Sequence, residues 1–462
     1  MRNLTLENIA KACNGSLFLI NGDDAEKEAT SVIIDSRKCV DGCVFIATRG
    51  ERVDGHSFIN QVWDNGALAV ICEDIPEKIS GNYIQVSDSF QALKGIAEFY
   101  RLQLDVKIVG IAGSVGKTST KEMVSAVLSQ KYSVQKTAGN FNNEVGVPLT
   151  LFTIDETHDV AVVEMGISDF SEMSRLSKMV KPDICVMTNI GPCHLENLGD
   201  LDGVLRAKSE IFESMNPSGH VVLNGDDEKL RTIKRVNDKT PMYFGIGTGN
   251  DVYAKNVLSK GLLGTECTIC TRNGSFDVMI PLPGVHHVMN ALAATQVGQI
   301  LNMNNEEIAA GITSVKATSG RSNIIEKDEY LVIDDCYNAN PKSMMAAIDL
   351  LGLSSGIRIA ILGDMFELGQ NEENLHGDVG EYVSKINPEL LICIGKLSAF
   401  MYEKASLGRG KKVYFETLED GISTILDLIK EICAGSDKKD SKPAILIKAS
   451  HGMHFEKIVE LF

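Results

Sequence analysis

The chain has 462 residues, and a chain of this length usually forms about three domains. Its 44% of hydrophobic and 23% of charged residues are typical of an ordinary globular protein. The net charge of −17 at pH 7 argues against general nucleic-acid binding, which needs a basic face. We find no apolar run of about 20 residues and no signal peptide, so we expect a cytoplasmic protein without a membrane span.

Short helices and strands alternate in the first part of the chain and predict a small N-terminal α/β domain over residues 1–104. Apolar periodicity and the flanking turn residues define its expected elements. The expected helices cover residues 6–13, 55–66 and 90–104, and the expected strands cover 31–35, 43–48 and 67–72.

Residues 105–316 alternate strands and helices as a mainly parallel sheet does, which predicts a central α/β domain. Within it, Cys267 and Cys270 form a lone Cys-x-x-Cys, and we expect reduced thiols there rather than a metal site. The expected strands cover 107–112, 160–164, 184–188 and 219–223, with a β-rich segment over 251–282 and a helix over 288–301.

Residues 317–462 restart the alternation and predict a C-terminal, Rossmann-like α/β domain. We expect the polar run over 435–442 to be a solvated loop. The expected strands cover 331–334, 358–363, 390–394 and 444–449, and the expected helices cover 343–350, 374–385 and 418–434.

The most specific motif is a glycine-rich turn between an apolar strand and a helix, in residues 108–121. Its glycines let backbone N–H groups face an anion, its lysine adds charge for outer phosphates, and its threonine offers a hydroxyl to Mg²⁺. Ile111 stands where the strict pattern has glycine, yet the segment still predicts a site for ATP or GTP. The predicted loop comprises Gly113, Ser114, Val115, Gly116, Lys117, Thr118 and Ser119.

Polar residues follow two later strands of the expected central sheet. Glu164 comes directly after an apolar run, and a carboxylate at a strand end beside a phosphate loop is placed to bind Mg²⁺. His194 lies in the loop over 188–196 and is a candidate for ligating a cation or contacting phosphates. Lys208 follows on an expected helix, where the residues alone favour an ordinary solvated lysine.

Three further segments carry candidate binding groups. Three amides and a carboxylate at 140–144, next to glycine and proline, suit a loop that binds a polar ligand, although a turn-rich connector has a similar composition. Asp334 and Asp335 end an expected strand and suit ribose hydroxyls or a substrate amine. Arg321, in the turn over 319–321, is a candidate cation for a transition state.

Taken together, these motifs resemble those of the Mur ligase family, over nearly the whole chain. The resemblance implies an ATP- and Mg²⁺-dependent ligase of peptidoglycan synthesis with a UDP-binding N-terminal domain, a central P-loop ATPase and a C-terminal ligase domain. Its implied partners are UDP-N-acetylmuramoyl-tripeptide and D-alanyl-D-alanine, joined by a monomer through an acyl phosphate. The motifs that carry it are 35–37, 54–56, 113–118, 142–148, 164–166, 189–194, 337–341 and 362–369, with His376.

The resemblance also implies roles for the candidate residues around the triphosphate. Lys117 binds the outer phosphates, while Thr118 and Glu164 hold one Mg²⁺. His194 holds a second Mg²⁺, aided by Lys208 if this lysine is carbamylated.

Further roles follow for the rest of the nucleotide and for the substrates. Asn290 contacts adenine, Asp335 the ribose and Arg321 the γ-phosphate. The chain departs from the family pattern at His287, where asparagine is usual, and at His451, where arginine is usual. The residues implied in substrate binding are Ser36, Arg37, Asn142, Asn143, Glu144, Tyr337, Asn338 and Asn340.

Two other hypotheses fit parts of the sequence. A ligase with a different amine substrate, such as a folylpolyglutamate-like enzyme, shares the amide chemistry, but residues 35–37 speak against it. A nucleotide-dependent switch needs only the phosphate loop, and Glu164, His194 and Arg321 supply more chemistry than a switch requires.

Overall fold

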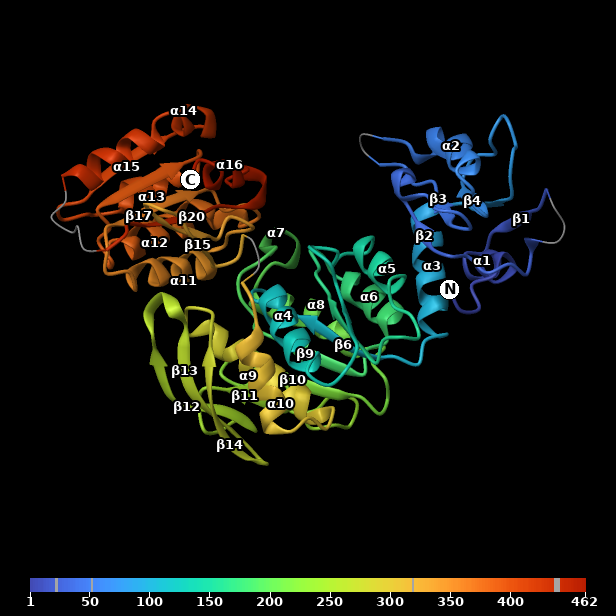
Figure 1. The fold of residues 1–462 in the computed structure, drawn as a ribbon, viewed down its shortest axis with the longest axis horizontal. Coiled ribbons are helices and arrows are strands. Elements are labelled where there is room, and N and C mark those ends of the chain that lie inside the picture. Colours follow the sequence, from blue (N-terminus) through green and yellow to red (C-terminus); the bar gives the residue numbers. More distant parts are fainter. Residues whose placement is uncertain (21–23, 51–52, 318–319, 436–440) are drawn as a thin grey trace.

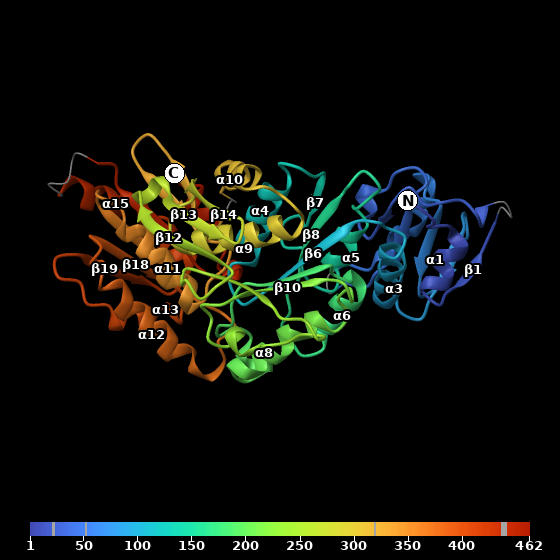
Figure 2. The same ribbon diagram turned by 90° about the horizontal axis from the view of Figure 1, so that it is seen from below.

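The computed structural model describes residues 1–20, 24–50, 53–317, 320–435 and 441–462. These residues form three β-sheets that follow one another along the chain. Figure 1 shows the N-terminal body (blue) and the C-terminal body (orange to red) on opposite sides of a central body, and Figure 2 shows the same order from below. Within the described ranges, no helix is long and apolar enough to cross a membrane.

The N-terminal body contains a five-stranded sheet in the order β1-β5-β4-β3-β2. Its described strand pairs are parallel except β1 with β5. The helix predicted over 55–66 is a 3₁₀ turn, Gly55–Phe58, followed by α2. The elements are α1 (Leu6–Ala12), β1 (Ser16–Phe18), β2 (Val32–Ile33), β3 (Val44–Ile46), α2 (Ile59–Asp64), β4 (Ala69–Cys72), β5 (Tyr83–Gln85) and α3 (Ser89–Arg101).

Helix α3 joins the N-terminal body to the central one. Asp88 caps its first turn by accepting hydrogen bonds from the N–H groups of Phe90 and Gln91. At its far end, the Tyr100 hydroxyl donates to the Ile154 carbonyl at 2.8 Å, so the helix is anchored in the central body. Buried side chains of both bodies form one continuous apolar cluster around this helix.

The central sheet has nine strands in the order β14-β13-β12-β11-β10-β9-β6-β8-β7. Strands β7 to β12 pair in parallel, whereas β13 and β14 add antiparallel hairpins, so the β-rich segment predicted over 251–282 extends this sheet. The strands are β6 (Lys107–Ala112), β7 (Val134–Lys136), β8 (Val160–Glu164), β9 (Ile184–Met187), β10 (His220–Asn224), β11 (Met242–Gly245), β12 (Val252–Ser259), β13 (Thr265–Thr271) and β14 (Gly274–Ile280).

Helices cover both faces of the central sheet. Helix α9 is buried along most of its length and packs against α4, which begins at the phosphate loop. Cys267 and Cys270 lie on β13 as free, buried thiols, so the β-strand prediction for them is confirmed. The helices are α4 (Lys117–Leu128), α5 (Gly146–Leu151), α6 (Glu172–Val180), α7 (Leu195–Leu198), α8 (Leu201–Ser209), α9 (His286–Ile300) and α10 (Asn305–Ser314).

The C-terminal sheet has six strands in the order β15-β16-β20-β17-β18-β19, and only β15 is antiparallel among its described pairs. The strands are β15 (Asn323–Glu326), β16 (Leu331–Asp334), β17 (Arg358–Gly363), β18 (Leu390–Ile394), β19 (Lys411–Phe415) and β20 (Ala444–Lys448). The helices are α11 (Pro341–Gly352), α12 (Glu372–Val383), α13 (Ser398–Lys404), α14 (Leu418–Ile422), α15 (Ile425–Ala434) and α16 (Glu456–Val459).

The three-part α/β fold with mainly parallel sheets is therefore confirmed, and the differences are local. The helix predicted over 418–434 is two helices, because the chain bends at Ser423 and Thr424 between α14 and α15. Some strands lack a prediction, since each is short or mixes polar with apolar residues: β1, β5, β7, β11, β15 and β19. The loop predicted over 435–442 lies outside the described residues at 436–440.

The packing of α10 against α4 gives a stability prediction. A Cβ added at Gly311 would lie 2.3 Å from Cα of Val127, so we expect Gly311→Ala to lower the free energy of unfolding by about 1–3 kcal/mol. The control is Gly377→Ala, also within a helix, where the nearest atom is Cγ of the flexible Lys404 side chain at 3.2 Å. Chemical denaturation of both variants tests this prediction. Equal denaturation midpoints for the two variants would contradict the close approach of α10 to α4.

Candidate active site

The predicted phosphate loop follows β6, the strand flanked by β8 and β9 in the central sheet. Gly113 has φ 148° and Gly116 has φ 80°, both in the region that favours glycine. A Cβ at Gly113 would lie 2.0 Å from Oγ1 of Thr188, so this position has no room for a side chain. Gly116 directly precedes α4, so the loop ends at a helix N-terminus, where backbone N–H groups attract anions.

The loop that follows β9 fixes the shape of the phosphate loop. The Thr188 hydroxyl donates to the Val115 carbonyl at 2.7 Å, and the Asn189 amide both accepts from Val115 N–H at 3.0 Å and donates to its carbonyl at 2.8 Å. The Ser114 hydroxyl donates to the Gly191 carbonyl at 3.0 Å. These contacts within the protein hold the curled shape of the phosphate loop.

Lys117 lies folded over its own loop. Its Nζ donates to the Gly113 carbonyl at 2.9 Å, and burial lowers the pKa of Lys117 below its usual value. An anion bound in the loop would stabilise the charged form of this ammonium group.

Glu164 is buried beside the first turn of α4. Its Oε2 accepts a hydrogen bond from the Thr118 hydroxyl at 2.8 Å, and its Oε1 accepts one from the Asn142 amide at 2.9 Å. Nζ of the buried Lys121 lies 3.8 Å from Oε2 and donates to the Thr137 carbonyl at 2.8 Å. A carboxylate and a hydroxyl in contact are the oxygen donors that Mg²⁺ prefers, so this pair fits the ion.

The C-terminal body contributes a second set of charged groups. The Arg321 guanidinium lies 4.0 Å above the centre of the Tyr337 ring. Asp335 is buried, and its two oxygens are engaged, one by Ser322 N–H at 2.8 Å and one by Nζ of Lys448 at 2.7 Å.

One cavity of about 760 Å³ brings residues of the central and C-terminal bodies together. It contains the phosphate loop, Glu164 and His194 on one side and the Arg321 segment on the other. The predicted site residues that line it are Ser114, Val115, Gly116, Lys117, Thr118, Ser119, Asn142, Asn143, Glu144, Glu164, His194, Asn290, Arg321, Asp335, Tyr337, Asn338 and Asn340.

Four predicted site residues do not line this cavity. Gly113 lies at its base within the loop, and Lys208 is buried on α8. Burial lowers the pKa of Lys208 to about 8, so the prediction of an ordinary solvated lysine from the residues alone is wrong. Ser36 and Arg37 lie in the N-terminal body, where the Arg37 guanidinium pairs with Asp35 at 2.8 Å.

The side chains of the amide-rich segment, residues 142–144, form hydrogen bonds with other parts of the protein. Asn142 donates to Glu164, and Oδ1 of Asn143 accepts from the Gly146 N–H at 2.8 Å. Glu144 accepts from Lys94 on α3 and from Arg175 on α6. Asn142 therefore helps to position Glu164, and Glu144 links α3 to the central body.

The two departures from the family pattern have distinct surroundings. Asn290 accepts from the Thr120 hydroxyl at 2.9 Å, and its amide nitrogen lies 3.3 Å from Nδ1 of His287. Burial lowers the pKa of His287 well below its usual value, so this ring is neutral. The His451 ring lies 5.6 Å from that of Tyr337, at the rim of the Arg321 segment.

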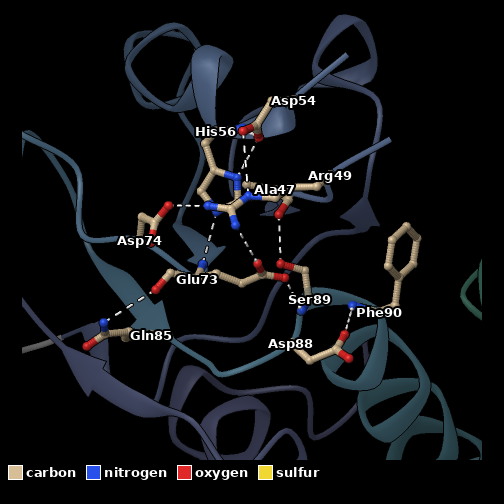
Figure 3. A network of polar contacts seen from close by, with 10 residues as sticks. All are labelled: Ala47, Arg49, Asp54, His56, Glu73, Asp74, Gln85, Asp88, Ser89 and Phe90. Carbon is tan, nitrogen blue, oxygen red and sulfur yellow. Dashed lines mark hydrogen bonds and ion pairs between the residues drawn. The ribbon is translucent and has the colours of Figure 1, made fainter. Parts of the chain in front are cut away.

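The N-terminal body contains a polar network around the predicted segment at 54–56 (Figure 3). Nε2 of His56 accepts from Glu73 N–H at 3.0 Å, so its Nδ1 carries the proton and donates to Asp54 at 2.7 Å. The Glu73 carboxylate accepts from Ser89 N–H at 2.8 Å at the start of α3, and Arg49 pairs with Asp54 and Glu73. This network joins Arg49 and the segment at 54–56 to Glu73 and to the start of α3.

Several cavity residues had no predicted role. Lys448, which pairs with Asp335, is one of them. Phe244 and Met289 are apolar residues that line the cavity. No signal identified them, because β11 itself was not predicted and the apolar residues of α9 do not gather on one face.

Comparison with known proteins agrees with this architecture. Three family models match in chain order: the Mur ligase family catalytic domain over 28–101, the Mur ligase middle domain over 111–298 and the Mur ligase glutamate ligase domain over 320–436. The UDP-N-acetylmuramoyl-tripeptide–D-alanyl-D-alanine ligase of Bacillus subtilis is 37% identical, over 99% of this chain and 97% of the relative.

Solved structures show the same agreement. MurF from Acinetobacter baumannii superposes with a TM-score of 0.89 at 31% identity, over 99% of this chain and 98% of that one. MurF from Thermotoga maritima, solved with ADP, gives a TM-score of 0.81 at 27% identity, over 94% and 96% of the two chains. The chain belongs to the Mur ligase family.

The contacts of Asn189 predict its importance for nucleotide binding. Asn189→Ala removes two hydrogen bonds to Val115, each worth about 1 kcal/mol, so we expect ATP affinity to fall about tenfold or more. Asn305→Ala, at a partly buried position on α10 outside the cavity, is the control and should bind ATP like the unmodified protein. Titration calorimetry measures both, and unchanged affinity in Asn189→Ala would contradict the bracing role.

Proposed function

We propose that this chain joins D-alanyl-D-alanine to UDP-N-acetylmuramoyl-tripeptide with the hydrolysis of ATP to ADP and phosphate. The observation that carries the proposal is the single cavity in which the phosphate loop and Glu164 face Arg321 and Asp335 from another body. The relatives that carry this activity in their names cover nearly the whole chain, which supports the same substrates here.

The proposed reaction has two steps. A carboxylate oxygen of the tripeptide attacks the γ-phosphorus of ATP, the bond to the β-phosphate oxygen breaks, and ADP leaves. The amine of D-alanyl-D-alanine then attacks the acyl phosphate, loses a proton, and phosphate departs from the tetrahedral intermediate. The protein contributes positioning and neutralisation of negative charge in both steps.

The nucleotide is held from both bodies in this proposal. Lys117 and the N–H groups of the loop bind the outer phosphates, and Arg321 meets the γ-phosphate from the C-terminal body. Asn290 on α9 would contact the adenine and Asp335 the ribose, and both residues line the cavity.

Thr118 and Glu164 would hold one Mg²⁺, and His194 would hold a second. Bound Mg²⁺ would neutralise charge on the transferring phosphoryl group. Glu164 is suited to this role because each of its oxygens accepts one hydrogen bond and keeps a lone pair.

The remaining parts of the proposal concern organisation. Residues 1–104, 105–316 and 317–462 act as domains, and Ser36 and Arg37 of the first bind the UDP end of the substrate. The three separate sheets support this division. One chain supplies the phosphate loop and Arg321 together, which supports a monomer, and we expect it to work in the cytoplasm.

The direct test is phosphate release with each substrate added alone and together. We expect rapid release only when ATP, UDP-N-acetylmuramoyl-tripeptide and D-alanyl-D-alanine are all present. Release that is indifferent to both substrates would contradict the proposal and favour a switch. Release that needs the tripeptide but accepts another amine would indicate a diverged ligase.

We further propose that Lys208 is carbamylated. A pKa of about 8 leaves much of this buried amine neutral near pH 8, and a neutral amine adds CO₂ to form a carbamate with loss of one proton. In ¹³C-bicarbonate, we expect a carbamate signal that Lys208→Arg abolishes and that strengthens as the pH rises from 7 to 8. Lys178→Arg, an exposed lysine on α6, is the control, and a signal that survives Lys208→Arg would contradict the assignment.

A further inference from the structure

The hairpin formed by β12 and β13 reaches from the central sheet to the C-terminal body. Leu262, in the 3₁₀ turn Gly261–Leu263 at the tip of the hairpin, packs against the apolar cluster of the C-terminal body that includes buried leucines of α11. A Cβ added at Gly261 would lie 3.9 Å from the carbonyl oxygen of Leu353, which directly follows α11. Figures 1 and 2 both place the hairpin next to α11.

The backbone of this tip is held in one shape. Lys260 N–H donates to the Gly264 carbonyl at 2.9 Å, and Nζ of Lys260 lies 2.9 Å from Oε2 of Glu266 on β13. Gly264 has φ 126°, and a Cβ there would lie 2.1 Å from the carbonyl oxygen of Ile280, so only glycine fits. Because Ile280 belongs to β14, the tip is held against the next strand as well. Leu262 therefore projects from a fixed support.

The two leucines of the turn have different surroundings. Leu262 is partly buried against the C-terminal body, whereas Leu263 is 77% exposed. Turns are usually built from glycine and polar residues, and an apolar side chain in a turn is stabilised where another element removes it from water. The packing of Leu262 therefore favours contact between the two bodies, and Leu263 offers a matched comparison in the same turn.

The hairpin and α11 both connect this contact to the cavity. On the central side, Phe244 of β11 lines the cavity and pairs with Val252 at the start of β12. On the C-terminal side, Lys342 and Ser343 line the cavity at the start of α11, and this helix of 12 residues is about 18 Å long. The two elements therefore border the cavity at one end and meet at Leu262 at the other.

We propose that Leu262 is a positioning residue that docks the hairpin on the C-terminal body and so holds Arg321 in the cavity of the phosphate loop. Arg321 and α11 belong to the same body, so a movement of α11 away from the hairpin carries Arg321 away from the loop. The inference rests on the proposed function only where that function places a γ-phosphate at Arg321. It adds that a hairpin of the central sheet sets the fraction of chains with a complete nucleotide site.

The first test compares small-angle X-ray scattering of Leu262→Asp, Leu263→Asp and the unmodified chain, all without nucleotide. Burial of a carboxylate against an apolar cluster is unfavourable, so we expect Leu262→Asp to undock the C-terminal body and raise the radius of gyration. Leu263→Asp should scatter like the unmodified chain. Leu262→Met keeps an apolar side chain of similar volume and should restore the compact curve. Identical scattering of Leu262→Asp and the unmodified chain would overturn the proposal.

The second test measures binding of a non-hydrolysable ATP analogue by titration calorimetry. Undocking lowers the apparent affinity by the fraction of chains that keep a complete site, so we expect about tenfold weaker binding in Leu262→Asp. Leu263→Asp and Leu262→Met should bind like the unmodified chain. Equal weakening by both aspartates would overturn the proposal, because it would indicate an effect of charge at the turn.

A double-mutant cycle with Arg321→Ala separates positioning from a general loss of stability. If Leu262 acts through Arg321, Arg321→Ala should weaken binding of the analogue in the unmodified chain and have little further effect in Leu262→Asp. Additive losses would overturn the proposal. Circular dichroism of each variant confirms that the fold is kept.

These tests also separate the inference from the proposed function. Scattering without nucleotide reports docking alone, and binding of the analogue needs neither the tripeptide nor D-alanyl-D-alanine. Unchanged binding in Arg321→Ala alone would count against the proposed contact with the γ-phosphate, whereas the scattering of Leu262→Asp decides the docking of the hairpin.

Discussion

The close approach of Gly113 to Thr188 is the constraint on which the site depends. Only a residue without a side chain fits there, and the loop can therefore curl back against the segment that follows β9. Strand β6 lies between β8 and β9, and the three strands are parallel. The phosphate loop, Glu164 and residues 188–194 therefore all lie at the carboxyl ends of these strands. Open parallel sheets bind ligands at the carboxyl ends of their strands, and the candidate nucleotide- and metal-binding residues meet there.

The central body supplies only some of the charged groups that line the cavity. Arg321 and Asp335 come from the C-terminal body, and their cavity exists because that body lies over the edge of the central sheet. The contact between His194 and Glu367 is one of the links between the two halves. A reactive acyl phosphate requires exclusion of water, and a site formed by two bodies can open for substrates and close for chemistry.

The sequence predicted those parts of the site that depend on local chemistry. The loop over 113–119 combines glycines, a lysine and a buried strand, and Glu164 stands at the end of an apolar run, so both were found from their residues. Arg321 and Asp335 were also candidates from their residues, and the family resemblance assigned their roles and added Asn290. These three residues lie on separate segments and meet only in the fold.

Features set by tertiary contacts were not predictable in this way. The ligand-binding prediction for the amides at 142–143 stays a prediction, but their contacts within the protein were not foreseen: Asn142 donates to Glu164, and Asn143 accepts from the N–H of Gly146 at the start of α5. Lys208 read as solvated because helix periodicity does not show that α8 is covered at that position. Short strands such as β7 depend on their neighbours for burial, and the contact of Glu367 with His194 joins residues that are 173 positions apart in the chain.

The central claim is that this two-body cavity activates a carboxylate with ATP. Labelling the tripeptide's terminal carboxylate with ¹⁸O and analysing the released phosphate by mass spectrometry tests it most directly. Passage through an acyl phosphate transfers one carboxylate oxygen to phosphorus, so the account predicts one ¹⁸O in each phosphate formed during ligation. Unlabelled phosphate released together with the amide product would contradict the account.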